Sequence, residues 1–379
     1  MASAGSDPGG GVAGDLQAPL TWRITADGSP SLWSAAFQQA FHCGSGALSE
    51  AHAKYILPAQ LDRFPPGSPL RVVEVCVGLG YNTGALLEAA ADQGLVVEWW
   101  GLELDPRPLT LALLEPRFRR LWRPATLGAL EHLRDWGHWG QRPAAPVQQG
   151  ERWGVDGQPA SASERQGPGL PMPAAGSPPP GADADLMGAA PPQPPHPQEP
   201  SRGGWCLGDA RQLLRHLVPT LRGRCDLVFL DAFSPGQCPQ LWTQEFLGQL
   251  GILLRPKGRL LTYCAAAAVR RGLELAGLEL ASLRPHGDLT GGSQPQLADR
   301  RQWSDGTAAS PSPLPTDGLL RPLSDMEREH LRSRAGVPYR DPLGNADTSE
   351  LHEQRRREQQ RDLSLESTSA WRRRWGLGP

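Results

Sequence analysis

The sequence lacks the patterns that mark metal-bound, disulfide-bonded and membrane-spanning proteins. Its six cysteines are scattered and form no C-x-x-C pair: Cys43, Cys76, Cys206, Cys225, Cys238 and Cys264. This scatter argues against a zinc site or a disulfide framework and fits a reducing cytoplasm. No run of about 18 apolar residues occurs, so we expect no membrane span. The first 17 residues hold no basic stretch followed by an apolar one, so we expect no signal peptide. We therefore predict a cytoplasmic protein without a metal.

The chain also has little net charge. A formal charge of −2 over 379 residues excludes general coating of nucleic acid and leaves only a local basic patch for an RNA contact. Glycine (44) and proline (39) exceed a fifth of the sequence, which indicates long unfolded segments. Residues 1–18 and 140–203 hold too few apolar side chains to fold. We predict a disordered N-terminus at 1–18, a domain at 19–285 interrupted by a disordered insertion at 140–203, and a low-complexity linker with a charged helical tail at 286–379.

What the sequence does contain is a strand, a glycine turn and a helix at residues 71–87. The run RVVEVCV is mostly apolar and β-branched, which suits a strand buried on both faces. Gly78 and Gly80 then permit a tight turn and close approach to a nucleotide. Asn82 or Thr83 is expected to cap the helix that follows. This order predicts the opening unit of a doubly wound, Rossmann-like α/β sheet.

The spacing of the glycines distinguishes two cofactors. Gly78, Gly80 and Gly84 read G-x-G-x-x-x-G, whereas a dinucleotide site needs G-x-G-x-x-G. An acidic residue, Glu74, lies four positions before the first glycine. This arrangement resembles the first motif of S-adenosylmethionine (SAM) methyltransferases, with Cys76 in place of its first glycine. The alternative is a glycine turn of the kind found in any βαβ protein.

Three acidic residues lie at or just after the ends of other predicted strands. Glu103 ends a strand at 96–104, near the spacing at which a carboxylate holds ribose hydroxyls, although a plain surface acid is the alternative. Asp209 follows a short strand from 204. There it either accepts a hydrogen bond from an adenine amine or simply caps the helix at 210–217. Asp231 lies at the carboxyl end of the strand 225–231, where open α/β sheets bind ligands.

The other segments predict elements around this sheet. Residues 21–25 and 31–34 flank a turn and are expected to pair as a hairpin, which either covers the cofactor or is an ordinary flap. Residues 107–136 look helical, and five of their arginines form a solvated face by default and an RNA surface as the alternative: Arg117, Arg119, Arg120, Arg123 and Arg134. A strand at 259–264, a helix at 265–276 and an edge strand at 278–283 complete the predicted domain.

Four stretches together resemble the methyltransferase half of the bacterial tRNA wobble-uridine enzyme of the MnmC type and its stand-alone relatives. Residues 74–82 read E-x-C-x-G-x-G-Y-N, similar to the family's E-x-G-F-G-x-G-L-N. The most specific stretch is F-L-D-A-F-S-P at 229–235, followed by P-x-x-W-T at 239–243. The third is V-R-R-G-L, which continues to A-G at 276–277, and the fourth is the weaker G-A-L-S-E at 46–50.

The resemblance implies a cofactor, an acceptor and a set of site residues. The cofactor would be SAM, and the acceptor the aminomethyl group at carbon 5 of the tRNA wobble uridine. Asp231 would be the catalytic residue, nearest to the sulfonium and the incoming amine. The residues implied at the cofactor are Glu74, Gly78, Gly80, Asn82, Glu103 (ribose), Asp209 (adenine), Ala210 and Asp231. Those implied at the substrate are Phe233, Pro235 and Trp242.

The chain departs from the family pattern in three places. Cys76 replaces a glycine, which we expect to be tolerated if its side chain turns into the core. No second G-x-G-x-x-G unit follows residue 285, so the flavin oxidase half of the two-domain enzyme is missing. The family's basic stretch after the last helix has no clean match at 285–288. Two other functions stay open: SAM-dependent or polyamine-type transfer to another amine, and a non-catalytic protein that has kept the fold.

Overall fold

The structure, a computed structural model, describes residues 17–141, 200–284 and 304–377. The segments 1–18 and 140–203, which are predicted to be disordered, therefore lie largely outside the described residues. The described end of the second segment enters a strand that includes Arg202. A further strand begins at Thr307, within the predicted linker.

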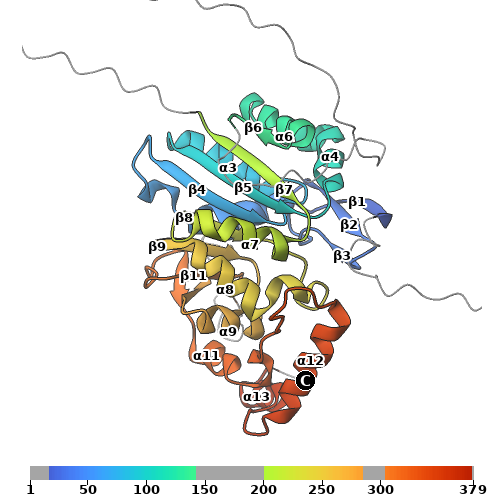
Figure 1. Ribbon diagram of the computed structural model, residues 1–379, viewed down its shortest axis with the longest axis vertical. Helices are drawn as coiled ribbons and strands as arrows, with labels where there is room; N and C mark the ends of the chain where they lie inside the picture. The colour runs from blue at the N-terminus through green and yellow to red at the C-terminus, as the bar shows by residue number, and fades with distance from the viewer. Residues whose placement is uncertain (1–16, 142–199, 285–303, 378–379) are drawn as a thin grey trace, which may run out of the picture. The chain divides into compact units, whose positions relative to one another are not determined.

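One large mixed sheet organises the described chain (Figure 1). Its strands in spatial order are β12 (Leu320–Pro322), β10 (Glu279–Leu283), β11 (Thr307–Ser310), β9 (Leu254–Thr262), β8 (Cys225–Leu230), β4 (Pro69–Val75), β5 (Val96–Glu103), β7 (Arg202–Leu207) and β6 (His138–Trp139). The five strands from β9 to β7 run parallel. Strands β11, β10, β12 and β6 are antiparallel to their neighbours.

Helices cover both faces of this sheet, as expected for a doubly wound fold. On one face lie α1 (Ala47–Ala51), the π-helical turn η2 (His52–Ile56), α2 (Leu57–Ala59), η3 (Leu61–Arg63), α3 (Tyr81–Asp92), α4 (Arg107–Leu114), α5 (Pro116–Arg119) and α6 (Pro124–Trp136). On the other lie α7 (Ala210–Leu221), η4 (Pro239–Trp242), α8 (Gln244–Leu253) and α9 (Ala267–Leu275). The helices that follow β4 and β5 in sequence lie on the first face, and those that follow β7, β8 and β9 lie on the second. In the sheet, this change of face falls between β4 and β8.

The predicted basic face over residues 107–136 is mostly neutralised. Arg119 pairs with Glu131 at 2.7 Å, and Arg134 pairs with its neighbour Asp135 at 2.6 Å. Arg123 lies between two carboxylates of α3. These exposed pairs favour the solvated face over an RNA surface.

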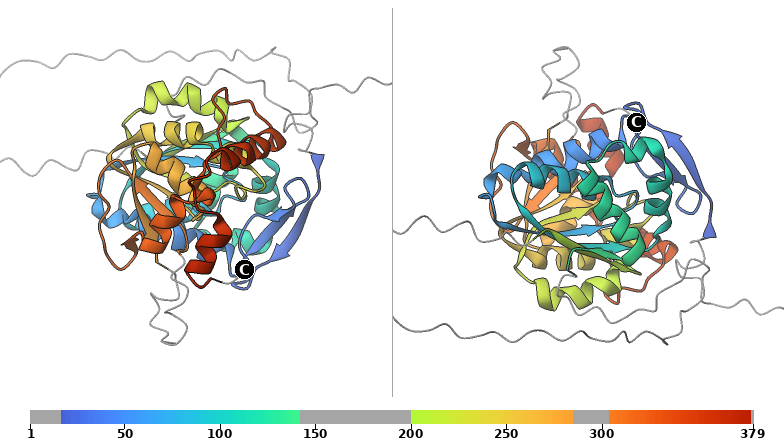
Figure 2. Two further views of the ribbon diagram at one scale, coloured as in Figure 1. Left: turned by 90° about the horizontal axis from the view of Figure 1, so that it is seen from below. Right: turned by 90° about the horizontal axis from the view of Figure 1, so that it is seen from above.

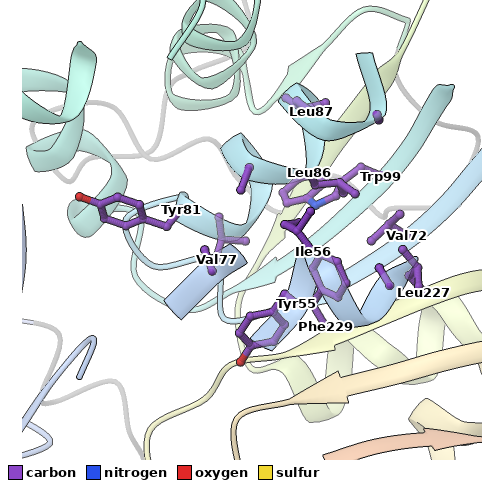
Figure 3. Close-up of a cluster of buried hydrophobic side chains, with 14 of the residues drawn as sticks. Tyr55, Ile56, Val72, Val77, Tyr81, Leu86, Leu87, Trp99, Leu227 and Phe229 are labelled. Carbon is purple, nitrogen blue, oxygen red and sulfur yellow. The ribbon is translucent and has the colours of Figure 1, made fainter. Parts of the chain in front are cut away.

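The apolar core lies under the glycine turn, between the sheet and α3 (Figure 3). Val72 of β4, Leu227 and Phe229 of β8, Leu86 of α3 and Trp99 of β5 gather there, and all are fully buried. Burying each large side chain contributes about 1.5–3 kcal/mol relative to exposing it. The apolar, β-branched strands are thus buried as their pattern predicts, and the core that they form supports the turn at the carboxyl end of β4.

The predicted hairpin forms and belongs to a separate small sheet. Strand β1 (Leu20–Ile24) pairs antiparallel with β2 (Pro30–Ser34), and β2 pairs with β3 (Gln39–Ala40). Ser234, in the loop after β8, donates to the side-chain oxygen of Gln39 through both its backbone nitrogen (3.1 Å) and its hydroxyl (2.8 Å). The small sheet is therefore attached to the loop that carries the F-L-D-A-F-S-P motif.

The sheet does not end at the predicted boundary, residue 285. Strand β11 comes from residues 307–310 and lies between β9 and β10, so β10 is an inner strand and not the predicted edge. The short strand was missed because its sequence, TAAS, has no apolar alternation and follows a Gly- and Ser-rich stretch. The domain thus includes residues that were assigned to a linker.

The C-terminal residues pack against the domain (Figure 2). Their elements are α11 (Asp325–Leu331), the short turn η5 (Arg334–Gly336), α12 (Thr348–Arg361) and α13 (Thr368–Arg374), of which α11 and η5 contact α9, and α12 contacts η4. A buried ion pair holds α11 in place: Arg270 of α9 donates to Glu327 at 2.9 Å. Arg270 also donates to Thr307 of β11 and Ser282 of β10. One arginine thereby ties the last helices to the sheet.

Candidate active site

A cavity of about 560 Å³ lies at the carboxyl ends of β4, β5, β7 and β8. This is where the helices change face, the usual place of ligand binding in open α/β sheets. The predicted site residues that line it are Gly78, Glu103, Asp209, Ala210, Asp231 and Phe233. The predicted site residues that do not line it are Glu74, Gly80, Asn82, Pro235 and Trp242.

The turn between β4 and α3 brings backbone close to the cavity. Cys76, Gly78 and Gly80 all have left-handed backbone, with φ of +66°, +56° and +87°. Gly78 lines the cavity, and its lack of a Cβ leaves room beside the Phe41 ring. Gly80 is the N-cap of α3, and a Cβ at this position would lie 3.0 Å from the Leu109 side chain. Gly78 is therefore the glycine placed for ligand contact, and Gly80 shapes the turn.

Cys76 lies differently from the expectation. The residue lines the cavity, and its left-handed backbone costs about 1–2 kcal/mol for a residue with a Cβ. Burial raises the pKa of its thiol well above the ordinary value, and the nearby charge of Glu103 raises it further. The residue is thus a neutral thiol in the wall of the site.

Glu103 joins the end of β5 to the glycine turn. Its Oε2 accepts a hydrogen bond from the backbone nitrogen of Gly78 at 2.9 Å. Its Oε1 accepts from the backbone nitrogens of Leu104 (2.7 Å) and Asp105 (2.9 Å). Burial raises the pKa of this carboxyl, against the lowering effect of these three donors. Glu103 lines the cavity, and the acceptor capacity that these three donors leave on its oxygens suits a pair of ligand hydroxyls.

Asp231 lies directly after β8, and two side chains hold its carboxylate. Tyr55 donates to Oδ1 at 2.7 Å, and the Asn82 amide donates to Oδ2 at 2.8 Å. Burial and the negative charge of Glu50 raise the pKa of Asp231 to about 6, although these two hydrogen bonds lower it. The group is oriented, faces the cavity and changes charge close to neutral pH, which are the properties of a proton acceptor.

Most charges around the cavity are paired. Lys54 donates to Glu50 at 2.6 Å, Arg107 to Asp105 at 2.6 Å, and Arg211 to Asp209 at 2.7 Å. Within the described parts of the chain, no lysine or arginine forms an ion pair with Glu103 or Asp231. Two uncompensated carboxylates therefore face the same cavity, an environment that favours a cationic ligand.

Asp209 has one of its two predicted roles, the helix cap, and it also lies in the wall of the cavity. It is the N-cap of α7, accepting from the backbone nitrogen of Arg211 at 2.9 Å, and it also lines the cavity next to Ala210. The guanidinium of Arg211 donates to both of its carboxylate oxygens. Capping and facing a ligand are thus compatible here.

Three polar residues near the turn serve the interior. Glu74 is fully buried, and its Oε2 accepts from Thr83 and from the indole of Trp99, each at 2.8 Å. Burial raises the pKa of Glu74 to about 8, so it is neutral at physiological pH. The predicted helix cap is wrong, because Gly80 is the N-cap while Thr83 bonds Glu74 and Asn82 bonds Asp231. Asn82 does not line the cavity, and it acts on the site through its hydrogen bond to Asp231.

The F-L-D-A-F-S-P loop supplies an aromatic wall. The rings of Phe233 and Phe37 stack with centroids 4.4 Å apart, and both line the cavity. Trp242 is fully buried, and its indole donates to the backbone oxygen of Phe233 at 2.7 Å. Trp242 supports the loop from behind, and Pro235 lies beyond the lining.

Sequence reasoning missed several residues of the site: Phe37, Glu50, Lys54, Tyr55 and Tyr263. Glu50 ended the weak G-A-L-S-E stretch, and the two residues after it on the same face, Lys54 and Tyr55, were readable only as parts of a helix. Tyr263 lies inside the strand predicted at 259–264, where no neighbouring acid or glycine marks it as a site residue. Its hydroxyl donates to the backbone oxygen of Ala232 at 2.8 Å.

The structure bears on the expected lack of a metal site and of a membrane span only for the residues that it describes. Among these, no three His, Cys, Asp or Glu side chains gather in a way that could hold a metal ion. No helix among them is long and apolar enough to cross a membrane.

Comparisons with known proteins agree with the motifs. Residues 205–292 match the family of S-adenosyl-L-methionine-dependent methyltransferases. The tRNA 5-methylaminomethyl-2-thiouridine biosynthesis bifunctional protein MnmC of Aeromonas salmonicida (strain A449) is 37% identical over 81 residues, which make up 21% of this chain and 12% of that protein. The crystal structure of MNMC2 from Aquifex aeolicus has a TM-score of 0.60 at 22% identity, covering 91% of this chain and 87% of that one.

These matches confirm the resemblance to MnmC-type methyltransferases, the Rossmann-like methyltransferase fold and SAM as the cofactor. The sequence match spans only about an eighth of its curated relative, so it covers neither that protein's second activity nor most of its length.

Proposed function

We propose that this SAM-dependent methyltransferase transfers a methyl group to the aminomethyl nitrogen at carbon 5 of the tRNA wobble uridine. The observation that carries the proposal is Asp231. It is an oriented carboxylate without a basic partner among the described residues, in the cavity at the end of the central strand β8. The name of the Aeromonas relative, which concerns this type of tRNA nucleoside, supports the choice of acceptor.

The cavity fits the cofactor in size and in charge. A volume of about 560 Å³ falls in the range of small-molecule sites, roughly 300–1,000 Å³. Glu103 would hold the ribose hydroxyls, Asp209 the adenine amine, and the backbone of Gly78 would lie against the ligand. When bound, SAM supplies a methyl group on a positively charged sulfur, which Glu103 and Asp231 favour electrostatically.

Asp231 would prepare the acceptor amine. A protonated alkyl amine has no lone pair for attack, so the site must hold it neutral and aligned with the methyl carbon. Asp231 accepts a hydrogen bond from the amine and directs its lone pair. As the nitrogen–carbon bond forms and the carbon–sulfur bond breaks, the proton leaves the nitrogen for the Asp231 carboxylate and then solvent. Tyr55 and Asn82 keep the carboxylate in place throughout.

The stacked pair Phe37 and Phe233 favours a nucleobase over a linear polyamine. Proteins that read single-stranded RNA stack its unpaired bases on aromatic side chains. Both rings line the cavity that also contains Asp231. A uridine stacked on this wall would bring its carbon-5 substituent toward the carboxylate, whereas a polyamine would use the wall only through cation–π contacts of its ammonium groups.

Mass spectrometry of digested nucleosides tests the proposal. The chain is incubated with SAM and tRNA that carries 5-aminomethyluridine, and in parallel with unmodified tRNA and with spermidine. We expect one added methyl group on aminomethyluridine and none in the two other reactions. No second G-x-G-x-x-G unit follows residue 285 among the 379 residues, so we expect these residues to leave the carboxymethylated precursor unchanged as well. Methylated spermidine would favour the alternative amine substrate, and SAM binding without any product would favour the non-catalytic alternative.

A further inference from the structure

The C-terminal segment at residues 337–352 forms part of the cavity wall. Thr348, the first residue of α12, lines the cavity together with Gln240 of η4. The Gln240 amide donates to the Thr348 hydroxyl at 2.8 Å. Nearby, His352 bonds the backbone oxygen of Gly236 at 3.0 Å, in the loop that follows β8. The end of the chain therefore meets the site beside its most specific motif.

A single buried guanidinium connects this segment to the predicted adenine contact. Arg211 is 7% exposed, and it donates to both carboxylate oxygens of Asp209 at 2.7–3.2 Å. Its Nη1 donates to Asp341 Oδ2 at 2.8 Å and to the backbone oxygen of Ala346 at 2.9 Å. Arg211 thus links a cavity carboxylate to a residue 130 positions away in the sequence.

Asp341 is itself held rigidly. It is 4% exposed, and its Oδ1 accepts from the backbone nitrogens of Gly344, Asn345 and Ala346 at 2.9–3.3 Å. A planar guanidinium held on one side by a fixed carboxylate has little freedom on its other side. The orientation of Asp209 is therefore set by a loop that contributes nothing to the Rossmann-like motifs.

We propose that Arg211 and Asp341 are positioning residues through which the C-terminal segment fixes Asp209 for the exocyclic amine of adenine. The inference extends the cofactor half of the proposed function and does not depend on the acceptor. Without Asp341, Arg211 loses its fixed anchor, and Asp209 shares the guanidinium with solvent and moves. The site then still binds the nucleoside, but its preference for adenine over a base without the exocyclic amine is smaller.

The test measures how well the site distinguishes two nucleosides. S-Adenosylhomocysteine has the amine donor of adenine, whereas S-inosylhomocysteine has a carbonyl oxygen there, which a carboxylate repels. Isothermal titration of the full chain should give wild type a preference of about 10- to 100-fold for the adenosyl ligand, the usual worth of one charge-assisted hydrogen bond. Asp341→Asn should lower this preference at least about threefold while affinity for the inosyl ligand stays the same. Arg211→Lys should behave similarly, because an ammonium cannot bridge both carboxylates in one plane.

A matched control separates positioning from general loosening of the segment. Arg340 docks the same segment by donating to Glu245 at 2.7 Å, and within the described part of the chain it forms no hydrogen bond or ion pair with Asp209 or Arg211. Arg340→Gln should leave the preference unchanged. Equal losses for both ligands in Asp341→Asn, or equal changes in Asp341→Asn and Arg340→Gln, would overturn the proposal. So would a wild type without preference. Failure of tRNA methylation alone would leave this result intact and would count only against the acceptor.

Discussion

The glycine turn at residues 76–80 and the C-terminal residues 304–377 both reach the cavity, but different forces hold them. The turn is fixed by backbone conformation over an apolar core, with Gly78 bonded to Glu103. The C-terminal residues are fixed by charged side chains, above all Arg270 with Glu327 and Arg211 with Asp341. The first region is compact in sequence, and the second joins residues 57 and 130 positions apart.

This difference shows where single substitutions should act. A substitution that changes backbone strain in the turn should change the free energy of unfolding by only about 1 kcal/mol, because the apolar core below stays intact. A buried ion pair is different: removing one partner leaves the other charge buried and uncompensated, at a cost of about 3–5 kcal/mol. The C-terminal region should therefore be the more vulnerable of the two.

Breaking the pair of Arg270 and Glu327 should give the largest loss of stability. Arg270→Met removes one of the two arginine partners of Glu327, and we expect it to lower the free energy of unfolding by about 1.5–3 kcal/mol in urea titrations. The control is Arg271→Met, which removes the exposed pair of Arg271 with Glu274 and should cost about 0–1 kcal/mol. Equal effects of the two substitutions would contradict the contrast between the regions.

The same pair predicts a dependence on pH. Burial raises the pKa of Glu327, but the hydrogen bond from Arg321 and the charge of Arg270 outweigh it and hold the pKa at about 2. Because the folded pKa is depressed, the stabilisation is complete above about pH 4.5 and is lost as pH falls toward 2. Arg270→Met should weaken this part of the wild-type stability profile without abolishing it, because Arg321 still pairs with Glu327 at 2.6 Å.

Two substitutions in the turn should have smaller effects of opposite sign. Cys76→Gly relieves a left-handed backbone strain of about 1–2 kcal/mol but adds unfolded-state entropy, for a net gain of about 0.5–1 kcal/mol. Gly78→Ala introduces the same strain beside Phe41 and should lose about 1–2 kcal/mol. Thermal melting checks both. Destabilisation by Cys76→Gly would mean that the thiol makes contacts worth more than the strain.

Much of the sheet could be predicted because its signals are local. Apolar β-branched runs, the turn glycines and acids at strand ends place β4, β5, β7 and β8 and most of the carboxylates of the cavity. Strand β11 could not be placed, since four small residues become a strand only because β9 and β10 flank them. Its assignment needs the tertiary structure.

The site residues that were missed likewise depend on tertiary contacts and carry no local sequence signal. Tyr55 orients Asp231 across 176 positions of sequence, and nothing in the local helix pattern marks it. The tail could not be read either, because a charged segment has the same composition whether its charges face solvent or, like Asp341, pair with a buried arginine. Charge pairing over long separations is therefore what the sequence pattern leaves open.

The central claim is that Asp231 takes the proton of the acceptor amine in a SAM site, and Asp231→Asn tests it most directly. The amide keeps the size of the side chain but removes the charge. We expect SAM affinity close to wild type by titration, and methyl transfer to aminomethyluridine in tRNA slower by about 100-fold or more in single-turnover assays. The wild-type rate should rise with pH through about 6, where Asp231 loses its proton, and this limb should vanish in the variant. A variant as fast as wild type, or one that no longer binds SAM, would contradict the claim.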